Sequence, residues 1–344
     1  MRALPLFLGL ALVLAGCATP SATPDAGTRP EEGPSYEVLP ASLSTMPEPA
    51  IDIGGIRGWW EQFVRATPYR HVGSPTNEIA ADMIAAFLKE AGYEARTLYY
   101  LPPNGAESPV AQGIRTVYGV KPGTQNPDHV IGWVAHYDSN QATIYAAYDD
   151  ASGVAAALEL ARVLAKVETN KTLMPIFFDA EEVGLVASQY FVQQALARGD
   201  VTFDLVIGHD MTGINCPGHE WPMYQMIGEN YLDVLKPVMS ELYEKFLKLD
   251  VGYGEEAKNC IVILDVHDRN SDERRFKEAD IPIIRMAGGR RATDYPEYHK
   301  PGDTIEYVYE FSGGPENYEK GLHMVIYTSY WSVLAFDALP SYTR

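Results

Sequence analysis

The stretch TLMPIFFDAEEVG, residues 172–184, is the part of this chain that indicates its fold most directly. An apolar run ends at Phe178, and three carboxylates follow within four positions, at Asp179, Glu181 and Glu182. A short apolar run bounded by polar residues is typical of a strand buried on both faces. Carboxylates this close together repel one another and shift one another's pKa, so a structural segment gains little from them. A solvated loop and a metal or general-base site both fit the pattern.

Segments of alternating type extend in both directions from this stretch. Segments that read as strands are 94–100, 114–120, 129–136, 172–180, 203–211, 260–265 and 281–287, and helical segments are 76–93, 152–167, 185–199, 231–249 and 316–337. We expect Ser152 to be the N-cap of the helix that follows it. Alternating strands and helices, with several strands apolar throughout, predict an α/β sandwich whose largely parallel sheet is covered on both faces.

Length and composition limit the classes of protein that remain. The chain has 344 residues, of which 46% are hydrophobic, so it can build a sizeable core. Its formal net charge is −19, and no basic stripe is visible that could bind phosphates. We therefore expect no nucleic-acid partner. No second change in composition follows residue 50, which predicts one globular domain over residues 51–344.

The amino-terminal residues suggest export. A short apolar run from Leu4 to Ala15 follows Arg2 and ends in LAGC at Cys17, which resembles a bacterial lipobox. Residues 1–16 are then a lipoprotein signal peptide, and the chain is anchored in the bacterial cell envelope, with the lipid on Cys17 as its membrane contact. The alternative is an ordinary signal peptide with a chance cysteine. Residues 17–50 are rich in Pro, Ser, Thr and Ala, which predicts a disordered tether.

The two remaining cysteines leave an alternative open. In an exported protein, Cys216 and Cys260 can form a disulfide or remain as buried free thiols. The sequence is silent on the distance between them and on the oligomeric state.

Histidines and carboxylates follow several of the expected strands, where ligands collect in open α/β sheets. Two histidines and three carboxylates suit a pair of zinc ions that share one carboxylate; they are His136, Asp149, Glu182, Asp210 and His299. Glu181 is then free to move protons, and Asp138 can accept from the His136 imidazole and hold its tautomer. The opening stretch would thus contain one metal ligand and one proton carrier.

This set of residues resembles the M28 family of zinc aminopeptidases. The matching stretches are RHVGSPTNEIAADMI (70–84), AHYDS (135–139), DDASG (149–153), FFDAEEVGLVASQYF (177–191), HDMTG (209–213), SDERRFKEADIPIIRM (271–286) and YHKPGDT (298–304). The resemblance implies a three-layer α/β sandwich with a mixed, mostly parallel sheet of about eight strands. It also implies an exopeptidase that releases amino-terminal residues from peptides by metal-activated water, with a glutamate as general base.

The resemblance assigns roles to the individual residues. Glu182 and His299 would hold one zinc ion, and His136 and Asp210 a second one. Asp149 would bridge the two ions, with Asp150 as the weaker candidate, because the aspartate loop is one residue shorter than in many members. The family also carries a cis peptide bond after the bridging aspartate. We therefore expect the Asp149–Asp150 bond to be cis.

Two features depart from the family pattern. The motif SDH reads SDE here, at residues 271–273, which puts any role of that loop in doubt. The shorter aspartate loop also resembles glutaminyl cyclases, which share the fold and use a single zinc ion, here on Asp149, Glu182 and His299. Tyr298 stands where the cyclases favour Trp, and this favours the peptidase. A binding protein without turnover is a third hypothesis, and the presence of Glu181 argues against it.

Overall fold

The apolar run that ends at Phe178 forms strand β4 (Lys171–Phe178), and every residue of this strand is buried. The computed structural model describes residues 38–101, 113–214, 223–247, 261–264, 271–288 and 295–341. Strand β3 (Asn126–His136) lies between β4 and β5 (Thr202–His209) and runs parallel to both. The central strands are therefore parallel and buried, as their apolar sequences predict.

The remaining strands make the sheet mixed. Strands β1 (Glu94–Tyr100) and β2 (Ile114–Val120) pair antiparallel to each other, and β2 pairs antiparallel to β4. On the other side of β5, β8 (Ile283–Gly288) is parallel to it. The strand order is β1-β2-β4-β3-β5-β8-β6-β7. Strands β6 (Met223–Ile227) and β7 (Ile261–Leu264) follow β8 and form one edge of the sheet. The predicted α/β fold with a mixed sheet is confirmed.

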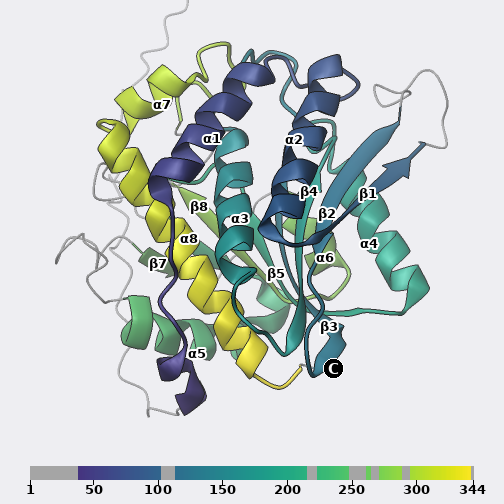
Figure 1. The fold of residues 1–344 in the computed structure, drawn as a ribbon, viewed down its shortest axis with the longest axis vertical. Helices are drawn as coiled ribbons and strands as arrows, with labels where there is room; N and C mark the ends of the chain where they lie inside the picture. Colours follow the sequence, from purple (N-terminus) through teal and green to yellow (C-terminus); the bar gives the residue numbers. More distant parts are fainter. Residues whose placement is uncertain are drawn as a thin grey trace, which may run out of the picture. The chain divides into compact units, whose positions relative to one another are not determined.

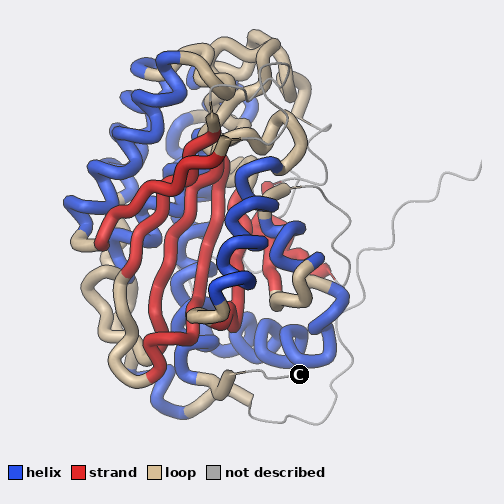
Figure 2. The backbone as a smooth tube through the Cα atoms, turned by 90° about the vertical axis from the view of Figure 1, so that its right-hand side faces the viewer, coloured by secondary structure: helices blue, strands red, loops and turns tan. Residues whose placement is uncertain are grey.

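Helices cover both faces of this sheet (Figures 1 and 2). On one face pack α1 (Ile53–Ala66), α2 (Pro75–Ala91), α3 (Ala151–Leu164), α5 (Leu232–Leu242), α7 (Ile305–Phe311) and α8 (Pro315–Ala338). On the other face pack α4 (Val186–Arg198) and α6 (Glu273–Glu278). The sheet is the middle layer of three, as the alternating segments predict.

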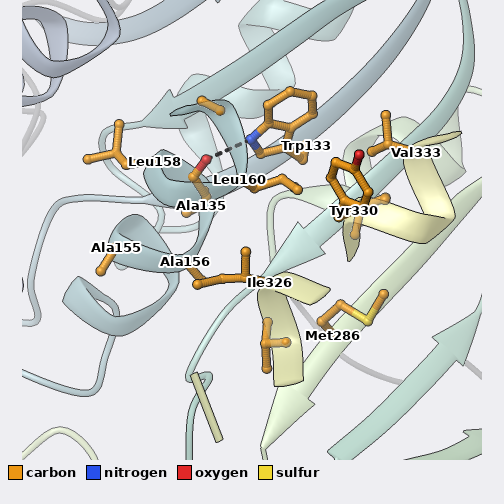
Figure 3. Packing of buried hydrophobic residues seen from close by; sticks show 14 of the residues in the cluster. Trp133, Ala135, Ala155, Ala156, Leu158, Leu160, Met286, Ile326, Tyr330 and Val333 are labelled. Carbon is orange, nitrogen blue, oxygen red and sulfur yellow. Dashed lines mark hydrogen bonds between the residues drawn. The ribbon is translucent and has the colours of Figure 1, made fainter. Parts of the chain in front are cut away.

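The core on the α3 side is built around Trp133. This residue of β3 is completely buried, and its indole Nε1 donates a 2.9 Å hydrogen bond to the carbonyl of Ala157 in α3. Figure 3 shows Trp133 near Leu160 of α3 and Tyr330 of α8. Because both helices are anchored on the central strands, the loops that leave these strands have a rigid base.

The helix that follows the aspartate loop starts earlier than expected. Asp150 is the N-cap of α3, and its Oδ1 accepts a 2.8 Å hydrogen bond from the backbone N–H of Gly153. Ser152 lies inside the first turn and donates to the carbonyl of Tyr148 instead. Our prediction of Ser152 as N-cap is therefore wrong. An aspartate at this position also suits the helix dipole.

The prediction of a disordered tether up to residue 50 is wrong for residues 38–50. A short 3₁₀-helix spans Ala41–Thr45, and the side chains of Leu39 and Leu43 are buried. The backbone N–H groups of Val38 and Leu39 donate to the carboxylate of Glu241 at 2.6 and 2.9 Å. The apolar Leu residues within the Pro-rich composition pack against the domain, so the folded unit begins at Val38.

Several predictions concern residues outside the described ranges. They are the signal peptide, Cys17, the tether up to residue 37, and the cysteines Cys216 and Cys260. Among the helices of the described residues, none has the length and apolar character needed to span a bilayer.

Candidate metal centre

The predicted site residues come together at the carboxyl ends of the central strands. His136 is the last residue of β3, Glu181 and Glu182 follow β4, and Asp210 follows β5. Since these three strands are parallel, their ends meet at one edge of the sheet. Asp149 precedes α3, and His299 lies in the loop before α7, so two further segments complete the cluster.

The carboxylate of Asp149 lies between two imidazoles. Its Oδ1 is 3.3 Å from Nε2 of His136, and its Oδ2 is 3.2 Å from Nε2 of His299. Two ligand atoms at ~2.0–2.1 Å from a tetrahedral zinc ion lie about 3.3 Å apart. Each imidazole therefore shares with one oxygen of Asp149 the separation that two ligands of one zinc ion have.

Glu182 completes the set around His299. Its Oε2 is 3.1 Å from Nε2 of His299 and accepts a 3.2 Å hydrogen bond from the side-chain amide of Asn140. Asn140 Nδ2 also lies 3.3 Å from His299 Nδ1, so this amide contacts both side chains. Among the described residues, Oε1 of Glu182 is buried without a hydrogen-bond partner. A buried carboxylate oxygen without a donor fits a divalent cation, so this group of residues suits zinc.

The charges of the cluster also favour a bound cation. Burial lowers the pKa of His299, but its contacts with Asp149 and Glu182 outweigh this effect and raise the pKa to about 10. The pKa of His136 is likewise raised well above its usual value, against the effect of burial. Burial raises the pKa of Glu181 well above its usual range. The cluster thus carries more negative charge than its imidazoles neutralise, and a bound cation would correct this.

Asp138 holds together two parts of the site. Its Oδ1 lies 3.3 Å from Nδ1 of His136, on the side of the ring away from Asp149. The same carboxylate accepts hydrogen bonds from the backbone N–H groups of Glu181 and Glu182, at 3.1 and 3.2 Å. One buried side chain therefore orients the imidazole and fixes the turn that carries both glutamates.

The two adjacent aspartates have different partners. Asp150 uses Oδ1 to accept hydrogen bonds from Gly153 and Met211, and its Oδ2 lies 3.3 Å from the backbone N–H of His136. Its carboxylate is thus engaged with backbone groups, whereas that of Asp149 faces the two imidazoles. This arrangement favours Asp149 as the shared ligand. The peptide bond between them is cis, which confirms that prediction.

Asp210 has a partner that the sequence did not suggest. Its Oδ2 accepts a 2.7 Å hydrogen bond from Nη2 of Arg285, whose guanidinium is buried. Nη1 of the same guanidinium lies 3.2 Å from Oε1 of Glu273, the residue that stands in place of the expected histidine of the SDH motif. Asp210 also lies near His136 and Asp150 in a group with ligand-like spacing. The SDE loop therefore acts on the site through Arg285.

Three further residues support the site and were missed in the sequence. The buried guanidinium of Arg70 donates to the carbonyls of Tyr137, Tyr145 and Ala146, and so ties down the loop after β3. Arg70 lies in the matching stretch RHVG, but its acceptors are 67 to 76 residues away. The signal for Arg285 was a single charge in the apolar segment IPIIRMA. Asn140 gave no signal of its own.

Asp303 contacts both the aspartate loop and the loop that carries His299. Its carboxylate accepts hydrogen bonds from the backbone N–H groups of Tyr148 and Asp149, at 2.9 and 3.1 Å. It also accepts a 3.0 Å hydrogen bond from the hydroxyl of Tyr295. Asp303 thereby connects the loop that carries His299 to the loop that carries Asp149.

The backbone is left-handed at several non-glycine positions of the site. His299 itself has φ 54°, Ala180 before Glu181 has φ 58°, and Met211 after Asp210 has φ 54°. Side chains with a Cβ avoid this region, so surrounding contacts must hold these residues there. Such residues cluster where a site requires a particular side-chain direction.

Two polar residues near the site have partners elsewhere. The Nε2 of His209 lies 2.8 Å from the hydroxyl of Ser329 in α8. Burial lowers the pKa of His209 to about 3. Asp179 accepts a 2.9 Å hydrogen bond from the amide of Asn77 and caps the strand end.

Comparisons with known proteins agree with this geometry. Residues 116–312, more than half of the chain, match the model of peptidase family M28. Aminopeptidase YwaD of Bacillus subtilis is 29% identical over 205 residues, which are 57% of this chain and 41% of that protein. The matched segment therefore spans less than half the length of this relative.

Solved structures show the same fold at low identity. A zinc aminopeptidase from Bacillus subtilis, BSAP, has a TM-score of 0.63 and 17% identity, over 83% of this chain and 96% of that one. A glutaminyl cyclase from Porphyromonas gingivalis has a TM-score of 0.62 and 17% identity, over 82% of this chain and 98% of that one. At this identity the likeness describes the fold, which both kinds of enzyme share.

Proposed function

Since this chain belongs to peptidase family M28, we propose that it is a zinc-dependent exopeptidase that hydrolyses amino-terminal residues from peptides. The observation that carries the proposal is the carboxylate of Asp149 between the imidazoles of His136 and His299. Glu181 lies beside this cluster and is partly exposed, so it can reach a substrate. The match to an aminopeptidase of Bacillus subtilis supports the same reaction.

The residues of the site have separate tasks in this proposal. Zinc is held by Asp149, Glu182 and His299. The side-chain amide of Asn140 contacts both Glu182 and His299 and so fixes their relative position. Zinc, when bound, polarises a substrate carbonyl and makes water a better nucleophile at neutral pH. Asp138 orients His136, which is the task that second-layer carboxylates have at metal sites.

Glu181 moves the proton in the proposed reaction. Its carboxylate takes a proton from the attacking water as the oxygen adds to the scissile carbonyl carbon. When the C–N bond breaks, Glu181 returns this proton to the leaving amine, so the enzyme ends in its starting state. Burial among other carboxylates raises the pKa of Glu181, which suits a group that must both accept and release a proton.

The charge of the site also suits the proposed substrate. A peptide with a free amino terminus carries a positive charge next to the bond to be cleaved, and the excess of carboxylates attracts it. An acidic chain with a net charge of −19 repels nucleic acid, so we propose peptides as its partners.

A glutaminyl cyclase is the second candidate, and one observation favours it. The ion pair between Arg285 and Asp210 leaves Asp149, Glu182 and His299 as a set for a single metal ion, as a cyclase requires. In that reaction the amino-terminal amine attacks the side-chain amide carbon of glutamine, and ammonia leaves. No peptide bond is broken, so the products distinguish the two reactions.

A substrate panel tests the proposal. The zinc-loaded protein is incubated with aminoacyl-nitroanilides, with their N-acetylated forms and with a glutaminyl peptide, and the products are identified by mass spectrometry. An aminopeptidase cleaves the free forms and leaves the acetylated forms intact. Ring formation on the glutaminyl peptide without release of an amino acid indicates the cyclase. Release of residues from the carboxyl terminus, or no turnover at all, contradicts the proposed function.

We also propose that the enzyme is exported and held in the bacterial cell envelope by a lipid on Cys17. The support is the apolar run followed by LAGC and the Pro-rich residues after it. The active site would then work on peptides outside the cytoplasm.

A further inference from the structure

Arg285 is a buried cation at the edge of the metal centre. Its exposed fraction is 3%, and its Nη2 donates to Oδ2 of Asp210 at 2.7 Å. Asp210 is one of the residues that the family resemblance assigns to the second of two metal ions. A ligand of that position is therefore already paired with a full positive charge from the protein itself.

The pair is part of a packed network. Arg285 lies beside Gly208, its partner in the register of β5 and β8. A Cβ on Gly208 would lie 2.6 Å from Oε2 of Glu273, so glycine leaves the space that this carboxylate occupies. Glu273 is completely buried and lies 3.2 Å from Nη1 of Arg285. Contacts on both sides thus fix the guanidinium where it faces Asp210.

Electrostatics reinforce this arrangement. Burial opposes the charge of Arg285, but the carboxylates of Asp210, Glu273 and Glu181 outweigh this effect and raise its pKa. A permanently charged guanidinium repels a divalent cation placed next to the same carboxylate.

The first metal position differs in this respect. Within the described ranges, Asp149 and Glu182 accept hydrogen bonds from no lysine or arginine. His299 contacts both carboxylates, and His136 contacts Asp149. An imidazole can lose its proton and become a ligand, which a guanidinium cannot do.

We infer that the guanidinium of Arg285 takes the place of the second metal ion. The chain then binds one zinc ion tightly, at Asp149, Glu182 and His299, and binds metal weakly at His136 and Asp210. This inference rests on the proposed zinc-dependent function. In place of the two expected zinc ions, the site would hold one zinc ion and the guanidinium of Arg285. Arg285 is then the residue that determines how many metal ions bind tightly.

A zinc titration tests the inference without relying on turnover. The metal-depleted protein is titrated with Zn²⁺ in competition with a chromophoric chelator, and the bound metal is counted by elemental analysis. The wild type should bind one equivalent tightly. Arg285→Met should bind a second equivalent about 10–100-fold more tightly than the wild type does, the range over which residues that contact ligands change metal affinity. Arg285→Lys retains the charge and should remain at one.

The controls separate the charge from the loss of a buried partner. Arg162 pairs with Glu159, a carboxylate with an exposed fraction of 1%. This pair lies at the opposite end of α3 from Asp149. Arg162→Met therefore removes the partner of a buried carboxylate far from the site and should leave the number of tightly bound zinc ions at one. If circular dichroism shows that Arg285→Met does not fold, the double variant Glu273→Gln, Arg285→Met is used in its place, because it removes the charges of both Arg285 and its buried partner Glu273.

Two results overturn the inference. One is a wild type that binds two equivalents with similar affinity, which needs no variant at all. The other is a folded Arg285→Met protein, or double variant, whose second equivalent binds no more tightly than in the wild type. Both results leave the proposed exopeptidase intact. Conversely, one tight zinc ion together with no cleavage of the substrate panel overturns the proposed function and leaves the inference standing.

Discussion

The carboxylate of Asp138 lies 3.3 Å from Nδ1 of His136. Through the same two oxygens it accepts the backbone N–H groups of Glu181 and Glu182. A metal-facing imidazole and the turn with the two glutamates therefore depend on one buried side chain. The contacts of the site are coupled through Asp138, even though the residues come from two different strands.

Replacing Asp138 with asparagine tests this coupling. The amide has one acceptor oxygen instead of two, so one backbone N–H of the glutamate turn loses its partner and the imidazole loses its anionic neighbour. We expect metal affinity or kcat/KM to fall about 10–100-fold while the protein stays folded. Zinc titration and kinetics on an aminoacyl-nitroanilide measure both quantities.

Asp179→Asn is the matched control, because it changes a buried carboxylate in the same region that faces Asn77 and not the metal centre. It should affect metal affinity much less than Asp138→Asn does. Equal effects of the two variants would contradict the positioning role of Asp138.

A second prediction concerns the end of the sheet away from the metal centre. The buried ammonium of Lys171 donates to the carbonyls of Phe336 and Leu339 at the end of α8, and lies 2.8 Å from Oδ2 of Asp204. Lys171→Met leaves these groups without their cation. We expect the free energy of unfolding to fall by about 3 kcal/mol, the lower end for a broken buried pair, because His129 still contacts Asp204. Denaturant unfolding measures the loss.

The exposed residue Lys166 is the control for this stability prediction. Lys166→Met should change the free energy of unfolding by no more than about 0.5 kcal/mol. Zinc affinity should be unchanged in both variants, since neither residue contacts the site. A Lys171→Met protein as stable as the wild type would show that the helix end does not need this ammonium.

The fold was predictable because its central strands are apolar on both faces. Residues 130–135 contain no polar side chain, and this pattern is typical of a buried parallel strand. β6 was missed, because the short segment Met223–Ile227 mixes polar and apolar residues and gains its place by pairing with β8. The residues from Val38 to residue 50 were misjudged for a related reason. Their composition is that of a linker, although Leu39 and Leu43 are buried in the core of the domain.

The site was predictable where its chemistry is local. His136, Glu182 and Asp210 follow strands whose ends meet, so their meeting follows from the order of elements. Arg285 and Asn140 act through contacts between segments that are far apart in the sequence. Such contacts depend on the direction of side chains in the folded state, and neither composition nor spacing reports that direction.

A third prediction concerns the anchor. If Cys17 carries a lipid, Cys17→Ser should move the protein from the membrane fraction to the soluble fraction of the cell. The physical reason is that acyl chains supply the apolar contact with the bilayer. Fractionation followed by immunoblotting measures this, and Cys216→Ser is the control that should remain with the membranes. A Cys17→Ser protein that is still retained by membranes would contradict the proposed lipid anchor.

The last prediction separates the two adjacent glutamates by their tasks. Glu182 faces His299 at 3.1 Å and accepts from Asn140, whereas Glu181 belongs to neither contact. Glu182→Gln should therefore weaken zinc binding, by about 10-fold or more, together with activity. Glu181→Gln should retain zinc and lose about 10²–10⁴-fold in kcat, since a general acid–base group is removed and the metal ligands remain. Zinc titration and steady-state kinetics on both variants measure the difference.

The comparison is internally controlled, because both variants remove one negative charge by the same isosteric change at neighbouring positions. A general effect of charge on the cluster predicts similar losses of zinc affinity for both. Separate tasks predict that zinc affinity and kcat respond to different residues, with KM little changed in Glu181→Gln because the metal and the pocket remain. Near-normal kcat in Glu181→Gln, or loss of its zinc, would therefore contradict the role of Glu181 in proton transfer. Asp272 would then be the next group to test, because it is buried and burial raises its pKa to about 8.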